Sequence, residues 1–264
     1  MSTAETPIAA PPTEPVWTLG TALLFVALWI VLLLLIQTFF TLVAVGIMSV
    51  TQGIDMDGAM DAFQREDGLT ARAVAAVGCV GLSWAATFAL IVRLLKRFPP
   101  AAVRKALGLQ PPVPPWSIAL GVPVGLALLV AGEILMRILS VSEDPTPIME
   151  LLKTPWGAAS VSFMALAIAP IAEEVFFRGF VFPPMARRFS LGTAMAFNGA
   201  IFAAVHLLTY GQEFGYLPPI FLLGFVLSGL RAWTGSVVPP IVAHFVFNAT
   251  SLFLFLLIGP DGTT

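Results

Sequence analysis

The chain has very little charge. Only 11% of its 264 residues are charged, whereas 58% are hydrophobic. Soluble globular domains carry about 25% charged residues, so this chain has too few charges to cover a water-facing surface. The formal net charge of -2 at pH 7 also excludes an overall basic nucleic-acid-binding protein. The composition therefore predicts a protein that lies mostly in lipid and has no nucleic-acid partner.

Cysteine and histidine are equally scarce. Cys79 is the single cysteine, which excludes an intramolecular disulfide and a cysteine-ligated zinc site. The two histidines, His206 and His244, both lie in apolar segments rather than in charged loops. Any bound metal would therefore have to be held by histidine and carboxylate side chains.

Seven apolar stretches reach, or nearly reach, the length that crosses a membrane. A span needs about 20 apolar residues, and the fifth and sixth stretches are short enough to be broken helices or to be buried in protein. An eighth, interfacial segment also fits the pattern. We therefore predict an all-α, polytopic membrane helix bundle of about seven to eight transmembrane helices. The seven stretches are residues 19–50, 73–95, 118–139, 156–182, 191–208, 217–233 and 237–258.

Composition also sets the boundaries of this bundle. Residues 1–18 contain four prolines and no Lys or Arg, which predicts a disordered N-terminal tail. Residues 259–264 form a short C-terminal tail. Residues 19–150 hold membrane helices without a chemical motif, whereas residues 151–258 contain the polar side chains that indicate a function.

Basic residues predict how the bundle is oriented. Arg93, Lys96, Arg97, Arg104 and Lys105 follow the second span, and basic loops stay in the cytoplasm. Seven spans with this bias place the N-terminus in the cytoplasm. We expect an integral protein of the cytoplasmic, or inner, membrane.

Charged side chains inside the spans are few, and each needs a partner or a task. A charge at the middle of a span costs roughly 2.5–3.5 kcal/mol on insertion scales. Glu133 and Arg137 lie four residues apart in the third span. Residues at this spacing share a helix face, so we expect the two to neutralise each other.

The fourth span contains two adjacent glutamates and one arginine. Glu174 and Arg178 lie four residues apart, whereas Glu173 is turned about 100° from Glu174 on an α-helix. Arg178 can therefore hold Glu174 and not easily both. We predict that Glu174 and Arg178 form a structural pair and that Glu173 stays free to accept a proton as a general base.

Both histidines have polar or aromatic companions one turn away. Phe202 precedes His206 by four residues, and His244 precedes Asn248 by four. A single histidine in a membrane helix can serve merely as a hydrogen-bonding contact between helices. Two histidines together with an unpaired glutamate and an asparagine favour a catalytic site, in a cavity within the membrane.

These motifs resemble a known family. In sequence order they are Glu173-Glu174-x-x-x-Arg178, Phe202-x-x-x-His206 and His244-x-x-x-Asn248. In this order on successive membrane helices, they resemble the CPBP (Abi) family of intramembrane proteases, which includes the type II CAAX prenyl endopeptidases, or Ras-converting enzymes. The resemblance covers roughly residues 155–255 and implies hydrolysis of a peptide bond within the membrane.

The resemblance also implies a role for each motif residue. Glu173 and His206 would orient and deprotonate water, while His244 and Asn248 would stabilise the developing oxyanion. An asparagine amide can donate to negative charge but cannot act as a base, which agrees with this division. The supporting residues, Glu174, Arg178 and Phe202, would shape the cavity. The implied substrate is a peptide or protein in contact with lipid, prenylated in the CAAX-type members.

A zinc-dependent version of the same hydrolysis uses three of these residues as ligands. Glu173, His206 and His244 could hold zinc and leave a fourth position for water. However, the chain lacks the His-Glu-x-x-His helix of ordinary zinc peptidases. The sequence therefore favours a site that requires no cofactor, with zinc as the alternative.

Two other classes of protein also keep polar groups inside a membrane. A transporter is disfavoured because the chain shows no inverted repeat and no matching broken helices. A non-catalytic membrane scaffold or bacteriocin-immunity protein on the same fold is the second alternative. The complete set of motif residues argues against it.

Overall fold

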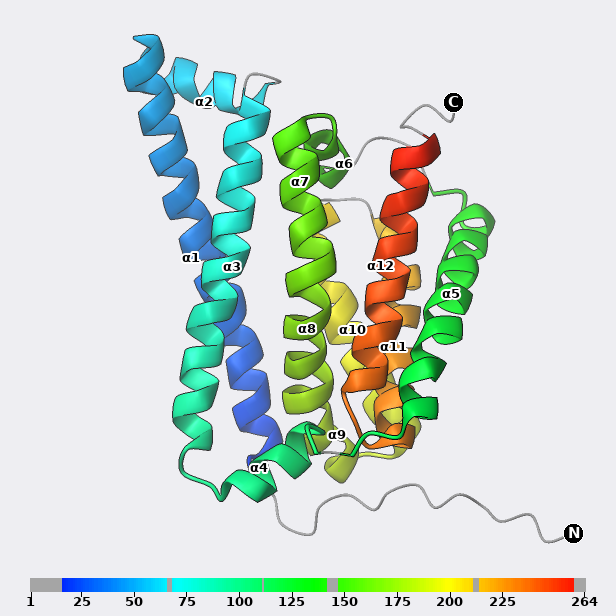
Figure 1. Ribbon diagram of the computed structural model, residues 1–264. Coiled ribbons are helices and arrows are strands. Elements are labelled where there is room, and N and C mark those ends of the chain that lie inside the picture. Colours follow the sequence, from blue (N-terminus) through cyan, green and yellow to red (C-terminus); the bar gives the residue numbers. More distant parts are fainter. Residues whose placement is uncertain (1–15, 66–67, 111, 142–146, 211–213, 259–264) are drawn as a thin grey trace, which may run out of the picture.

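The computed structural model describes residues 16–65, 68–110, 112–141, 147–210 and 214–258, and all regular elements in these ranges are helices (Figure 1). The part of the chain before the fourth span forms α1 (Leu19–Gln52), α2 (Met56–Gln64), α3 (Leu69–Leu95), α4 (Pro100–Leu107), α5 (Pro115–Ile138) and α6 (Pro147–Leu152). The part that follows forms α7 (Pro155–Phe163), η2 (Met164–Ile168), α8 (Ala169–Glu173), η3 (Glu174–Val181), α9 (Phe182–Arg188), α10 (Leu191–Tyr210), η4 (Phe214–Tyr216), α11 (Leu217–Thr234) and α12 (Val238–Ile258).

Six helices in the described part of the chain are long and apolar enough to cross a membrane, so this is an integral membrane protein. Five of them are α1, α3, α5, α11 with the η4 turn before it, and α12. The sixth is the continuous helical run Pro155–Arg188, which contains α7 to α9. The predicted span at 191–208 is a helix, α10, of which the part Leu191–Leu207 is a shorter apolar helix among the described residues. The total of about seven to eight spans stays a prediction.

The run Pro155–Arg188 passes between the other helices. In Figure 1, α1 and α3 lie together on one side, joined by α2, while α5 and α12 lie together on the other. The helices α10 and α11 pack against each other at the back of the view, α10 behind this run and α11 behind α12. The polar residues of the fourth span are therefore at the centre of the bundle, where neighbouring helices surround them.

Helix ends follow the local chemistry of the chain. The hydroxyl of Thr18 accepts a hydrogen bond from the Thr21 amide at the start of α1, and Thr154 caps Gly157 at the start of α7 in the same way. Proline occupies the first turn of α4, α5, α7 and α11, where its missing N–H costs nothing. The prolines that separate the predicted spans therefore mark the starts of the observed helices.

Glycines bring neighbouring helices into close contact. A Cβ added to Gly125 of α5 would collide with the Ala243 carbonyl oxygen of α12. On the other pair, a Cβ at Gly224 of α11 would lie 2.8 Å from the Cα of Gly199 in α10. Side chains at these positions would push the backbones apart. The helices that carry His206 and His244 are thereby fixed against their partners.

The N-terminal boundary differs from the sequence-based one. Residues 1–15 and 259–264, most of the two predicted tails, lie outside the described residues. Val16 and Trp17, which the sequence placed in the N-terminal tail, are buried. The Trp17 indole nitrogen donates to the Phe180 carbonyl oxygen at 2.8 Å, and its ring stacks on Phe180 with centroids 4.9 Å apart. An apolar side chain at this position is held by the bundle, which composition alone does not reveal.

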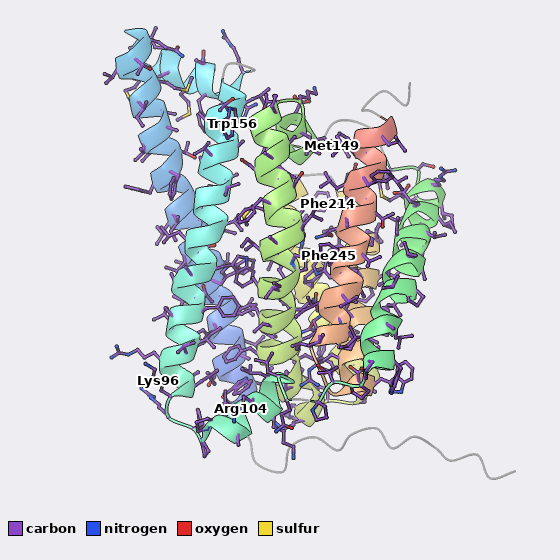
Figure 2. All side chains as sticks on the ribbon, viewed as in Figure 1. Lys96, Arg104, Met149, Trp156, Phe214 and Phe245 are labelled. Carbon is purple, nitrogen blue, oxygen red and sulfur yellow. The ribbon has the colours of Figure 1, made fainter. Side chains whose placement is uncertain are left out.

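Charge divides the two ends of the bundle. Lys96 and Arg104 lie at the end where α3 turns into α4, and Trp156 lies at the opposite end, near α2 (Figure 2). Asp55 caps the start of α2, and the helix contains Asp57 and Asp61. This arrangement agrees with the separation of basic and acidic loops in the sequence.

Candidate active site

The two adjacent glutamates lie where the fourth span changes its winding. Glu173 ends α8 and Glu174 begins η3, a stretch of π-helix that runs to Val181. An earlier π-helical stretch, η2, ends two residues before Pro170, and η3 ends two residues before Pro183. A proline ring clashes with the carbonyl four residues earlier in an α-helix, and a wider turn relieves this clash. The residue spacing in this span predicts an α-helix throughout and gives no sign of these wider turns.

The predicted pair of Glu174 and Arg178 is present and completely buried. The Glu174 Oε1 and Arg178 Nη1 atoms lie 2.8 Å apart, and both side chains are 0% exposed. Arg178 also donates from Nη2 to the Gly224 carbonyl oxygen at 3.1 Å, and its guanidinium lies 4.4 Å from the centre of the Phe202 ring. The arginine thus connects η3 to both α10 and α11.

Glu174 has a second partner that the sequence spacing did not reveal. His244 Nδ1 lies 2.8 Å from the same Glu174 Oε1 atom that contacts Arg178. Because an ionised carboxylate accepts hydrogen bonds, His244 donates its Nδ1 proton to Glu174. This bond fixes the ring so that its Nε2 atom is directed away from Glu174.

Glu173 lies between the two histidines. Its Oε2 atom is 3.8 Å from His206 Nε2 and 4.0 Å from His244 Nε2. His206 Nδ1 lies 2.6 Å from the Phe202 carbonyl oxygen, and because that oxygen is an acceptor, Nδ1 is the donor. The Phe202 and His206 rings pack with centroids 4.5 Å apart, as their spacing predicted. Glu173 of α8, His206 of α10 and His244 of α12 thus approach one another at the Glu173 Oε2 atom and the two Nε2 atoms.

The Glu173 oxygen that faces the histidines is buried and has no hydrogen-bond partner among the described residues. If both rings are neutral, their Nδ1 protons leave Nε2 as an acceptor in each. A carboxylate and two ring nitrogens therefore face one another without a donor between them. Such a group attracts a molecule that can donate hydrogen bonds to it, and water is the smallest one.

Asn248 lies one turn after His244 on α12, as expected. Its side-chain amide donates to the Ala165 carbonyl oxygen of η2 at 2.9 Å. A side-chain amide has two N–H donors, so this bond leaves one for another acceptor. The bond joins α12 to the part of the fourth span that comes before Glu173 in the chain.

Side chains that carry no recognisable motif support η3. Asn198 of α10 is fully buried and donates to the Phe177 carbonyl oxygen at 3.0 Å. Ser228 of α11 donates to the Asn198 side-chain oxygen at 3.1 Å. Trp17 bonds the Phe180 carbonyl in the same stretch. The position of Asn198, on the stripe of Phe202 and His206, was the only sequence signal for this network.

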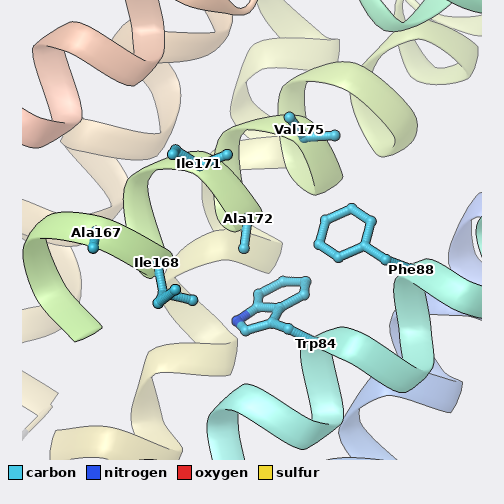
Figure 3. Close-up of a pocket in the computed structure, with 7 residues that line it drawn as sticks. All are labelled: Trp84, Phe88, Ala167, Ile168, Ile171, Ala172 and Val175. Carbon is cyan, nitrogen blue, oxygen red and sulfur yellow. The ribbon is translucent and has the colours of Figure 1, made fainter. Parts of the chain in front are cut away.

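A cavity around the site stays a prediction. An apolar hollow with a volume of about 340 Å³ lies between α3 and the fourth span (Figure 3). Ile168, Ala172 and Val175 line it together with Trp84 and Phe88 of α3. None of the predicted catalytic side chains is among its lining residues. Since Ala172 and Glu173 point about 100° apart on a helix, the hollow and the histidines lie on different faces of the span.

The three side chains that the zinc alternative would use as ligands, Glu173, His206 and His244, approach one another at Glu173 Oε2. Within the described ranges, no group of three or more His, Cys, Asp or Glu side chains is arranged to hold a metal ion. The lone pairs of Glu173 and the two histidines are nevertheless directed toward a common region. The choice between a metal-free site and a zinc site stays a prediction.

Comparison with protein families agrees with the motif analysis. The family model of the type II CAAX prenyl endopeptidases, Rce1-like, matches residues 155–250. Comparisons with curated proteins and with solved structures gave no match. The resemblance to the CAAX endopeptidase, or CPBP, family is therefore confirmed over the segment from the start of α7 into α12. This segment contains all the motif residues, and the family is one of proteases.

Proposed function

We propose that this protein is an intramembrane endopeptidase that hydrolyses a peptide bond with water activated by Glu173 and His206. The observation that carries the proposal is the meeting of Glu173 Oε2 with His206 Nε2 at 3.8 Å, between helices and inside a region that matches a protease family. Both side chains are mostly buried, with 15% and 19% of their surfaces exposed. A water held here is screened from bulk solvent but can still be reached.

In the proposed reaction, one water donates hydrogen bonds to Glu173 Oε2 and His206 Nε2. The water oxygen attacks the carbonyl carbon of the scissile bond, and Glu173 takes the proton that the water loses. The C–N bond breaks as the tetrahedral intermediate collapses, and Glu173 returns its proton to the leaving amine. A carboxylate that is held near the water without a cation of its own is suited to both steps.

The oxyanion of the intermediate is stabilised by Asn248 and His244. The second N–H of the Asn248 amide is the donor that remains after the bond to Ala165. His244 can donate from Nε2 only when its ring carries two protons, because Glu174 accepts the proton on Nδ1. Glu174 is therefore a positioning residue in this scheme, since it fixes the ring of His244 toward the reacting atoms.

We propose that the substrate is a peptide or protein segment at the membrane, with the cleaved bond near the C-terminus of a lipidated, CAAX-type or other membrane-associated protein. The spans around the site and the match to the type II CAAX prenyl endopeptidase family support this class. We further propose that the N-terminus and the end of the bundle with α4 face the cytoplasm, in the cytoplasmic membrane. The basic residues at that end support this orientation.

The deciding experiment compares cells that make the wild-type protein with cells that make Glu173→Ala. New C-termini of membrane proteins that occur only with the wild type would identify the substrate and the bond. Identical C-termini in the two samples would contradict the proposal and favour a non-catalytic membrane scaffold.

Metal analysis of the purified protein separates the two chemical schemes. The proposal expects activity without stoichiometric zinc and no loss of activity with chelators. Zinc bound at one equivalent, and lost in Glu173→Ala, His206→Ala and His244→Ala, would replace the metal-free scheme with the zinc-dependent one.

A further inference from the structure

The turn between α3 and α4 carries a concentrated positive charge. Its five basic side chains, which we call the basic elbow, are all exposed and lie within thirteen residues that contain no acidic residue. They take part in none of the ion pairs between described residues. Figure 2 shows Lys96 and Arg104 projecting at this end of the bundle. The basic elbow consists of Arg93, Lys96, Arg97, Arg104 and Lys105.

No acidic side chain in the described ranges compensates this charge. The described acidic residues lie at α2, in the second half of α5, in α6 and in the buried site. The helices α2 and α6 are at the opposite end of the bundle (Figure 1). The acidic residues are Asp55, Asp57, Asp61, Glu133, Glu150, Glu173 and Glu174. The basic elbow therefore attracts anions at a place where spanning helices end.

The helix α4 has one face on the protein and one face outside. Ala106 and Leu107 are buried, whereas Arg104 and Lys105 are exposed. In Figure 1, α4 lies across the ends of the spans rather than along them. A short helix that lies across the bundle end with basic residues on its outer face is placed at the level of lipid headgroups.

The end of α4 is fastened to the helices that form the candidate site. Arg231 of α11 donates to the Ala106 carbonyl oxygen at 3.1 Å, and the Val237 amide, just before α12, donates to the Gly108 carbonyl oxygen at 3.1 Å. The Leu107 carbonyl packs against Gly179 of η3, because a Cβ added to Gly179 would lie 3.1 Å from it. A force that holds α4 in place thus restrains η3 and the start of α12.

We propose that the basic elbow binds the headgroups of anionic phospholipids, and that these headgroups hold α4 against the helices that carry Glu174 and His244. Basic residues at a membrane surface attract anionic lipid by about fivefold each in binding constant. The partner is a lipid of the bilayer rather than a free anion, because the basic elbow lies where the spans end and its cations are spread along the chain. Five such cations select anionic over zwitterionic headgroups.

The test measures lipid retention by the full-length protein in detergent, with native mass spectrometry. The elbow variant Lys96→Gln/Arg97→Gln is compared with a control, Arg65→Gln/Arg137→Gln, that removes the same number of exposed positive charges near the opposite end. Wild type and control should retain phosphatidylglycerol over phosphatidylcholine. The elbow variant should bind phosphatidylglycerol about 30-fold more weakly, from the loss of two cations.

A second measurement follows the thermal midpoint as phosphatidylglycerol is added. A ligand that binds the folded state raises this midpoint, so the rise should occur in wild type and control and be strongly reduced in the elbow variant. High salt should reduce the rise in wild type, which tests the basic elbow without any substitution. Glycerol phosphate, the free headgroup, should produce no rise at the same concentration.

Equal retention of phosphatidylglycerol by the elbow and control variants would overturn the proposal, as would equal retention of the two lipids by wild type. A rise with glycerol phosphate alone would replace the bilayer lipid with a free anion. None of these readouts depends on peptide cleavage, so the lipid site and the proposed peptidase stand or fall separately.

Discussion

Two glutamate–arginine pairs with the same spacing lie in very different surroundings. Glu133 and Arg137 in α5 are both exposed on the bundle surface and form none of the ion pairs between described residues. Glu174 and Arg178 in η3 are both fully buried, with their charged atoms 2.8 Å apart. Our expectation that Glu133 and Arg137 would neutralise each other was therefore wrong, whereas the expectation for Glu174 and Arg178 is confirmed.

The difference shows what spacing can and cannot establish. Four residues place two side chains on one helix face in both cases, which allows an ion pair but does not require one. An exposed charged side chain gains little free energy from an ion pair, because solvent or lipid headgroups can also stabilise its charge. A buried charge has no such alternative, so Glu174 and Arg178 must find partners within the protein. Burial, which comes from the packing of other helices, decides between the outcomes.

The largest expected effect concerns the glutamate next to the buried pair. Glu173→Gln should lower kcat by about 10²–10⁴-fold and leave KM nearly unchanged, because it removes a general base and not a substrate-binding group. Glu133→Gln, which removes a carboxylate from the surface of the same bundle, should keep full activity. Cleavage kinetics in proteoliposomes measure both. Similar kcat values for the two variants would remove Glu173 from the mechanism.

The two adjacent glutamates should differ almost as strongly in their contribution to the stability of the protein. Glu174→Gln leaves Arg178 with a buried charge and no anionic partner in contact, which typically costs about 3–5 kcal/mol of unfolding free energy. Glu173→Gln should cost clearly less, because Glu173 forms no ion pair with an arginine or a lysine. Unfolding in mixed micelles measures these differences. Equal stability of the Glu174 and Glu173 variants would contradict the division between a structural and a chemical glutamate.

Asn248→Ala tests the proposed oxyanion donor on α12, the helix that also carries His244. Loss of one such donor typically lowers kcat by about 10²–10³-fold, so residual cleavage should stay measurable. His206→Ala, in contrast, should leave no more activity than Glu173→Gln. The same kinetic assay compares them. Wild-type kcat in Asn248→Ala would restrict Asn248 to its structural bond with Ala165.

A smaller loss of stability should follow when the hydrogen bonds that support η3 are removed and the Glu174–Arg178 pair is retained. Asn198→Ala removes the side-chain donor to the Phe177 carbonyl in η3 and the acceptor of the Ser228 hydroxyl. An unsatisfied buried group costs about 1–3 kcal/mol. The control Thr193→Ala alters an exposed hydroxyl of the same helix and should cost less. Unfolding free energies that agree for the two variants would show that Asn198 does not support η3.

The smallest effect belongs to the exposed pair. The double variant Glu133→Gln/Arg137→Gln should change the unfolding free energy by no more than about 0.5 kcal/mol, because substitutions away from buried contacts rarely do more. Its cleavage activity should equal that of the wild type. A loss above 2 kcal/mol would mean that the pair forms in the bilayer, and the contrast between the two pairs would then fail.

Much of the candidate site was predictable because its residues occur at helical spacing. The pairs Glu174–Arg178 and Phe202–His206 were expected from a four-residue separation, and both contacts occur. The link between His244 and Glu174 was not predictable, since it joins residues 70 apart in the chain. Trp17 was assigned to a tail for the same reason, because its partner Phe180 is 163 residues away.

The all-α fold class is confirmed for the described residues, whereas the number of spans stays a prediction. Apolar composition predicts membrane helices reliably, because the bilayer leaves no other solvent for backbone groups. The helix α10 packs on α11 and on η3. Hydropathy alone cannot tell a span that faces lipid from a helix that other helices cover, so it does not fix the count.

The sequence by itself determined that the protein is helical, that it lies in a membrane and which residue types could perform hydrolysis. Those properties depend on composition and on short spacings along one helix. Only the tertiary structure decided which carboxylate is buried, which nitrogen of each histidine faces Glu173, and how α4 is tied to the site. These outcomes depend on contacts between distant segments, and such contacts exist only once the helices have packed together.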